Sequence, residues 1–113
     1  MTKPWVGALA GIWLAAASPA LGQQAVTIEL AIAAGDPVGG AAVARVEQGD
    51  TVTFKVTSDE AGELHLHGYD ISIQVAAGET LSQPFEARAT GRFPLEIHEG
   101  GHGTLLYLEV YPR

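Results

Sequence analysis

Residues 63–73 read ELHLHGYDISI, and two alternating patterns meet in this stretch at Gly68. The apolar residues are even-numbered before the glycine and odd-numbered after it: Leu64 and Leu66, then Tyr69, Ile71 and Ile73. A period of two is typical of a half-buried antiparallel β-strand, which has one buried face. The change of phase at a glycine predicts a β-bulge or a strand that passes between sheets, and it would re-aim the side chain of His67.

The same alternation recurs along the chain and predicts an all-β domain. It appears at residues 26–32, 51–57, 63–67, 71–75, 93–98 and 106–111, and shorter strands are expected near 43–46 and 81–87. Turn residues separate the runs, most clearly at 49–50, 59–62, 78, 91 and 100–103. No segment has a convincing helical period. Seven or eight short strands at this spacing indicate a sandwich or a barrel.

The first 22 residues have the features of a cleavable secretory signal. Lys3 is the only charged residue among residues 1–22, an apolar run follows it, and small residues end the segment. The run is short for a membrane span, which needs about 20 apolar residues. We expect cleavage after Gly22, with Ala20 as the alternative, and a periplasmic mature domain of residues 23–113 without a membrane span. The alternative, a buried N-terminal helix, would need a polar face that this segment lacks.

The net charge and the cysteine content restrict the partners and ligands that the protein can bind. The chain has a formal net charge of −7, and removal of residues 1–22 takes away one lysine and no acid, which leaves −8. An acidic domain is a poor partner for nucleic acid and for anionic membranes, whereas it would attract a basic envelope protein. The chain has no cysteine. Disulfides and thiolate metal ligands are therefore excluded, and packing alone must stabilise the fold.

Five short motifs follow one another in an order that resembles the cupredoxins. They are HGYDI at 67–71, AGET at 77–80, FEA at 85–87, GRF at 91–93 and LEV at 108–110, with a histidine-rich turn before the last. The likeness is to the domains of cytochrome oxidase subunit II and nitrous-oxide reductase, and it covers the chain from about Val43 onward. It implies a Greek-key β-sandwich with a copper site built from a histidine, a cysteine, a second histidine and often a methionine. His67 stands where the family has its first histidine.

The sequence departs from that family at the sulfur ligands. Ile97 stands where the cysteine is expected, and Leu105 or Leu106 stands at the position of the methionine. A blue type-1 centre owes its colour and its potential to the copper–thiolate bond, so this chain cannot form one. The resemblance therefore implies the cupredoxin fold without the blue copper chemistry.

All four histidines lie in two short segments: His65 and His67, then His98 and His102. The cupredoxin arrangement makes the strands that carry these segments neighbours at one end of the sandwich. Imidazole suits copper(II), zinc and nickel, and copper(II) binds such ligands most tightly. We predict that His67 and His98 bind one copper(II) ion. His102 is the first choice for a third ligand and His65 its substitute, and zinc should compete less well.

Carboxylates close to the histidines offer either further ligands or hydrogen-bond acceptors that orient the rings: Glu63, Asp70, Glu96 and Glu99. The histidines also have a plainer interpretation as polar residues of a solvated strand face. His65 and His67 alternate in step with Glu63, and His98 alternates in step with Glu96.

The predicted function is copper(II) binding as a carrier, a buffer or an electron-transfer centre. The segment HLH at 65–67 also resembles the copper-binding strand of copper-zinc superoxide dismutase, but the further ligands of that enzyme are absent at its spacings. No nucleophile elbow, phosphate loop or dinucleotide motif occurs, so we expect a binding protein and not an enzyme. The alternative is a metal-free cupredoxin fold that serves as an interaction module of the cell envelope, through an edge strand or its acidic face.

Overall fold

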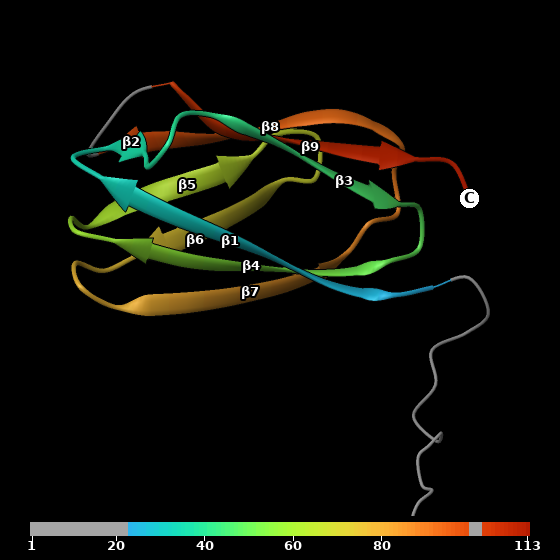
Figure 1. The fold of residues 1–113 in the computed structure, drawn as a ribbon, viewed down its shortest axis with the longest axis horizontal. Helices are drawn as coiled ribbons and strands as arrows, with labels where there is room; N and C mark the ends of the chain where they lie inside the picture. Colours follow the sequence, from blue (N-terminus) through green and yellow to red (C-terminus); the bar gives the residue numbers. More distant parts are fainter. Residues whose placement is uncertain (1–22, 100–102) are drawn as a thin grey trace, which may run out of the picture.

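The computed structural model describes residues 23–99 and 103–113, which form a sandwich of two β-sheets (Figure 1). Nine strands and no helix occur in these residues. The strands are β1 (Ala25–Ala33), β2 (Asp36–Pro37), β3 (Ala42–Glu47), β4 (Thr51–Ser58), β5 (Gly62–Leu66), β6 (Ile71–Val75), β7 (Thr80–Glu86), β8 (Gly91–Glu99) and β9 (Thr104–Tyr111). The predicted all-β class is confirmed. The nine strands exceed the predicted seven or eight because the two-residue strand β2 lies in a stretch without alternation.

Two expectations at the N-terminus concern residues that the structure does not describe. The predicted signal peptide, residues 1–22, lies outside the described residues, so its cleavage and the export of the protein stay predictions. Within the described part of the chain, no helix is long and apolar enough to cross a membrane.

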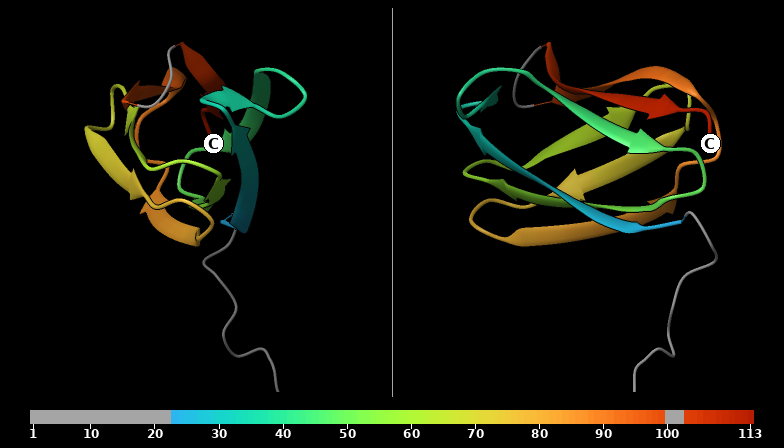
Figure 2. Two further views of the ribbon diagram at one scale, coloured as in Figure 1. Left: turned by 90° about the vertical axis from the view of Figure 1, so that its left-hand side faces the viewer. Right: turned by 45° about the vertical axis from the view of Figure 1, so that its right-hand side comes forward.

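The two sheets face each other and exchange strands repeatedly. The four-stranded sheet has the order β2-β1-β4-β7, and the five-stranded sheet has the order β3-β9-β8-β5-β6. Figures 1 and 2 show the two layers from three directions. The chain changes layer after β2, β3, β4, β6 and β7. This crossing between layers is the Greek-key connectivity of a β-sandwich.

Two strand pairs are parallel, although the alternation predicted antiparallel strands. β1 runs parallel to β4, and β3 runs parallel to β9, whereas the remaining pairs are antiparallel. The chain visits the other sheet as β3 between β1 and β4, so β4 returns in the same direction as β1. Alternation in one strand reports which face is buried and says nothing about the direction of its neighbour.

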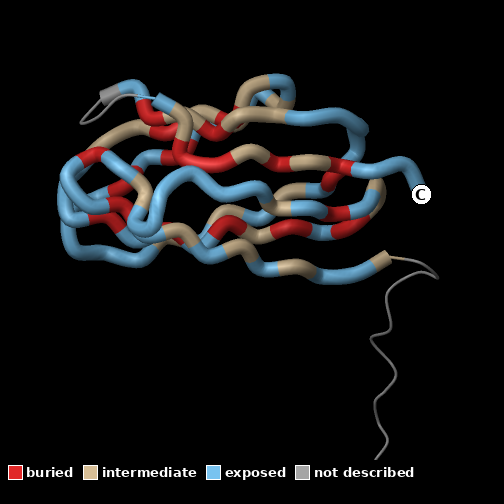
Figure 3. Tube along the Cα trace, turned by 45° about the horizontal axis from the view of Figure 1, so that its top comes forward, coloured by how far each residue is buried: buried red, intermediate tan, exposed pale blue. Residues whose placement is uncertain are grey.

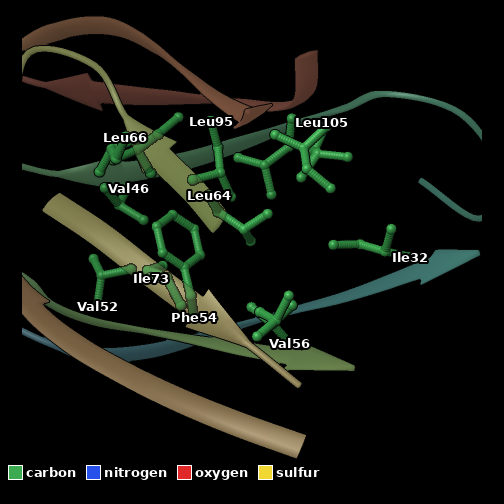
Figure 4. Packing of buried hydrophobic residues seen from close by; sticks show 14 of the residues in the cluster. Ile32, Val46, Val52, Phe54, Val56, Leu64, Leu66, Ile73, Leu95 and Leu105 are labelled. Carbon is green, nitrogen blue, oxygen red and sulfur yellow. The ribbon is translucent and has the colours of Figure 1, made fainter. Parts of the chain in front are cut away.

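The core lies between the two sheets and is built from inward-facing aliphatic side chains around Phe54 (Figure 4). Phe54 is 0% exposed, and Val52 and Val56 beside it in β4 are buried as well. The facing sheet contributes Leu64, Leu66, Leu95, Ile97, Leu106 and Leu108. Buried and more exposed residues alternate along the tube in Figure 3. The predicted phase of these strands is therefore confirmed.

Gly68 lies in a hairpin turn, so the prediction of a bulge or a change of sheet at this residue was wrong. Leu66 pairs with Ile71 across the neighbouring strands β5 and β6, and residues 67–70 form the turn. Residues that pair across two strands lie on the same face of the sheet, so the even-numbered core residues of β5 pair with odd-numbered core residues of β6. This pairing explains the change of phase. Gly68 has φ +87°, and a Cβ at this position would overlap the ring of Phe93.

Candidate metal centre

Three histidines from two neighbouring strands meet on the five-stranded sheet. His65 lies in β5, His67 follows directly after β5, and His98 lies in β8, which pairs with β5. One ligand atom from each ring lies within 4.8 Å of those of the other two. The structure thus brings together three of the four predicted residues, whereas His102 lies outside the described residues.

The three rings face away from the core because their neighbours in the chain face into it. Leu64 and Leu66 are buried on either side of His65, and buried Ile97 precedes His98. Successive side chains of a strand point to opposite faces of a sheet. The histidines therefore lie on the outer face of the five-stranded sheet, separate from the packed interior.

A β-bulge in β8 occurs at His98. In the pairing of β5 with β8, Leu64 is opposite Ile97, but the next residue back, Glu63, is opposite Glu99. His98 is the additional residue on the β8 side, without a partner in β5. Bulges re-aim side chains, and this one lies next to the two histidines of β5 and its turn.

Glu96 holds the ring of His67. Its Oε1 lies 3.0 Å from Nε2 of His67, and its Oε2 accepts a hydrogen bond of 3.4 Å from Oγ1 of Thr104. The backbone N–H of His67 also donates to the carbonyl of Pro94, at 3.1 Å. Thr104 was missed in the sequence because its pairing with Glu96 follows from a register shift between β8 and β9.

His65 is the most enclosed ring of the three. Its side chain is 24% exposed, against 41% for His67, and His98 is an exposed residue. The ring centroid of His65 lies 4.5 Å from that of His67 and 5.5 Å from that of His98, edge-on in both cases. Nδ1 of His65 is buried and has no hydrogen-bond partner among the described residues. Such an atom costs about 1–3 kcal/mol, and a metal ion would supply the missing partner.

An open hollow of about 260 Å³ lies beside two of the rings and is lined by Glu63, His65, Ser72 and His98. Asp70 also lies near this group, with Oδ1 3.5 Å from Nε2 of His65. Three of the four predicted carboxylates therefore lie close to the histidines. The side chain of the fourth, Glu99, falls outside the described part of the structure.

The positions of the two cupredoxin sulfur ligands carry buried aliphatic side chains. Ile97 is 6% exposed, and both Leu105 and Leu106 are almost fully buried. A thiolate copper centre does not fit these residues. Three imidazoles with a free Nδ1 among them do fit an ion that is bound by nitrogen alone.

The fold matches solved copper proteins. A multicopper oxidase from Pseudomonas thermotolerans superposes with a TM-score of 0.62 and 24% identity, over 79% of this chain and 30% of that one. A heme-copper terminal oxidase superposes with a TM-score of 0.58 and 18% identity, over 74% of this chain and 63% of that one. A copper nitrite reductase from Nitrosomonas europaea superposes with a TM-score of 0.57 and 20% identity, over 80% of this chain and 42% of that one. No family model and no curated protein matches the sequence.

At these identities the likeness shows the fold alone, and the fold is cupredoxin-like, as the order of motifs implied. The chain spans less than two thirds of the length of each of these structures.

Proposed function

We propose that the protein binds one copper(II) ion through His65, His67 and His98 and serves as a copper carrier or buffer outside the cytoplasm. The observation that supports this most directly is the cluster of three ligand atoms, one from each ring, all within 4.8 Å of one another. Metal–nitrogen bonds of about 2.0–2.1 Å require ligand nitrogens about 3–4 Å apart. Ligand nitrogens that are up to 4.8 Å apart would therefore move closer together by about 1–2 Å when the ion binds.

The ligand set favours copper(II). Imidazole nitrogens without a thiolate suit copper(II) and zinc, and copper(II) has the greater intrinsic affinity for such ligands. The solved structures with this fold include proteins named as copper oxidases and as a copper nitrite reductase, which supports copper as the metal. Zinc is the expected weaker competitor.

The exposure of the site favours a carrier or a buffer. His98 is exposed and the hollow beside it is open to solvent, so a partner protein or a small ligand could reach the ion directly. Residues 1–22 support a role outside the cytoplasm through their secretory pattern. An electron-transfer role would require reversible reduction of the loaded protein, which voltammetry tests.

Calorimetric titration of copper(II) into the purified protein tests the proposal. We expect one ion per chain, and at least a tenfold loss of affinity for His65→Ala, His67→Ala and His98→Ala. The matched control is Gln74→Ala, because Gln74 is exposed in β6 of the same sheet. His102→Ala decides whether the fourth histidine contributes.

The loaded protein should be pale, because it lacks the intense thiolate charge-transfer absorption of a blue site. Its electron paramagnetic resonance spectrum should look tetragonal and show nitrogen couplings. An affinity no tighter than about 10 μM would end the metal proposal, because scattered surface histidines can reach that value. Tight binding that all three variants retain would mean that other residues hold the ion.

The second candidate is an interaction module, and an exposed apolar residue in an edge strand favours it. β3 is an edge strand of the five-stranded sheet, and Val43 within it is 41% exposed. An edge strand can pair with a strand of another chain. The formal net charge of −7 favours a basic partner whose affinity falls as salt rises. Binding that is independent of salt would point to the apolar edge instead.

A further inference from the structure

The two nitrogens of each histidine ring have different surroundings, and this difference selects the atom that can bind a metal. A neutral imidazole has one N–H donor and one nitrogen with a free lone pair. The hydrogen bond at one nitrogen determines which nitrogen remains available to the metal. The ligand atom can therefore be inferred from the neighbours of each ring.

In His67 the neighbour is a carboxylate. Nε2 lies 3.0 Å from Oε1 of Glu96. An ionised carboxylate only accepts hydrogen bonds, so Nε2 must carry the proton and Nδ1 keeps its lone pair. The second oxygen of Glu96 accepts from Thr104, which limits rotation of the carboxylate. Glu96 lies opposite His65 in the strand pairing, so the backbone also fixes its position.

Glu96 stands beside the cluster and not within it. The group of ligand atoms that lie within 4.8 Å of one another consists of the three histidines. A carboxylate that contacts one ring but lies outside the ligand group is positioned to accept a hydrogen bond from that ring and so to orient it.

The two nitrogens of the His65 ring have neighbours of the same kind as those of His67. Nε2 is 3.5 Å from Oδ1 of Asp70, whose side chain is fully exposed. Nδ1 is buried and lacks a hydrogen-bond partner in the described structure. In both rings Nε2 therefore faces a carboxylate, and Nδ1 is the nitrogen available to a metal. The contact of His65 with Asp70 is longer and more exposed than that of His67 with Glu96.

We infer that the metal is bound through Nδ1 of His65 and Nδ1 of His67, and that Glu96 is the positioning residue that keeps His67 protonated on Nε2. This inference rests on the proposed metal site. Glu96 acts through His67 and does not itself touch the ion. Its carboxylate also makes the ring a stronger donor to a cation, because a negative charge at Nε2–H raises the electron density at Nδ1.

Nitrogen-15 NMR of the imidazole rings tests the ligand atom directly. In the metal-free protein, at a pH where the ring is neutral, we expect His67 to carry its proton on Nε2. In protein loaded with zinc(II), which is diamagnetic, Nδ1 of His65 and of His67 should be the nitrogens whose shifts move on binding. A proton on Nδ1 of His67, or a zinc-dependent shift that is larger at its Nε2 than at its Nδ1, would overturn the inference.

Variants of Glu96 test the positioning role. Glu96→Ala removes the acceptor and should weaken copper(II) binding about 10–100-fold, with a mixture of tautomers at His67. Glu96→Gln retains a neutral acceptor, so its loss should be smaller and the tautomer should be kept. The matched control is Glu79→Gln, which removes a charge in an exposed turn between β6 and β7.

The outcomes separate the inference from the proposed function. A parent protein that fails to bind copper(II) or zinc(II) overturns both. A parent that binds while Glu96→Ala binds equally well, with an unchanged tautomer at His67, overturns the role of Glu96 and leaves the metal site intact. A loss of affinity in Glu79→Gln as large as that in Glu96→Ala would assign the effect to net charge and would also overturn it.

Discussion

Ala34 has φ +54°, a left-handed conformation that is costly for a residue with a Cβ. Ala34 and Gly35 form the two-residue loop between β1 and β2, where Ala33 pairs with Asp36. Such loops favour Asn-Gly. We expect Ala34→Asn to raise the free energy of unfolding by about 0.5–1 kcal/mol, measured by urea denaturation. Ala34→Val, which is β-branched, should lower it, and the opposite order would contradict this account of the loop.

Phe54 is the buried ring at the centre of the core, and its phase in β4 was predicted correctly. Its ring centroid lies 5.2 Å from that of Phe85 in the neighbouring strand β7. We expect Phe54→Ala to lower the free energy of unfolding by about 3–5 kcal/mol, because it leaves a cavity. The control is Lys55→Ala, which changes the adjacent exposed residue. A loss below about 0.5 kcal/mol for Phe54→Ala would contradict its central position.

The histidines show how far residue spacing can predict a site. His65 and His67 are two residues apart, so their rings share one face of the sheet, and the resemblance made β8 with His98 a neighbour. The sequence pattern favours His102 over His65 as the third ligand. The described structure has His65 in the cluster, and His102 lies outside the described residues, so its contribution stays a prediction. Ring orientation and the contact with Glu96 depend on register, which spacing alone does not encode.

At the scale of the elements, alternation predicted the strands with one buried face but not the neighbours of each strand in its sheet. β4, β5 and β6 alternate cleanly because one face packs in the core. β2 has two residues and carries no period. The parallel pairs and the bulge at His98 arise from the path of the chain between sheets, and no local pattern records that path.

Asp50 contacts three chain segments, which contain Gln24, Glu47 and Arg113. It is buried and accepts hydrogen bonds from the backbone N–H of Gln24 at 3.1 Å and of Glu47 at 2.9 Å, and its carboxylate pairs with Arg113. Asp50→Ala leaves these donors without an acceptor, which costs about 1–3 kcal/mol for each buried group. We expect a loss of at least about 2 kcal/mol in the free energy of unfolding by urea denaturation.

Asp50→Asn keeps an acceptor and loses only the charge, so it should be less harmful than Asp50→Ala. The control is Asp36→Ala, at an exposed position in β2. Equal stability of Asp50→Ala and the parent protein would mean that water replaces the carboxylate at no cost.

At the scale of the whole molecule, the core and the histidine cluster lie on opposite sides of the five-stranded sheet. The buried side chains fill the space between the sheets, and the three rings lie on the outer face. In the described part of the chain, the cluster between the sheets consists of apolar side chains, and none of the three clustered histidines belongs to it. The fold should therefore be complete before any metal binds, unlike small domains in which the metal completes the core.

This separation predicts a stable protein without metal and a further gain on binding. After treatment with a chelator, the protein should keep its β-sheet circular dichroism and unfold in one cooperative transition. Free copper(II) at 100 times the dissociation constant should then add about 2.7 kcal/mol to the free energy of unfolding, because the ion binds only the folded chain. His67→Ala should unfold like the metal-free parent and gain much less from copper(II). An unfolded chelated protein would instead mean that the metal is needed for folding, in spite of the position of the cluster on the outer face.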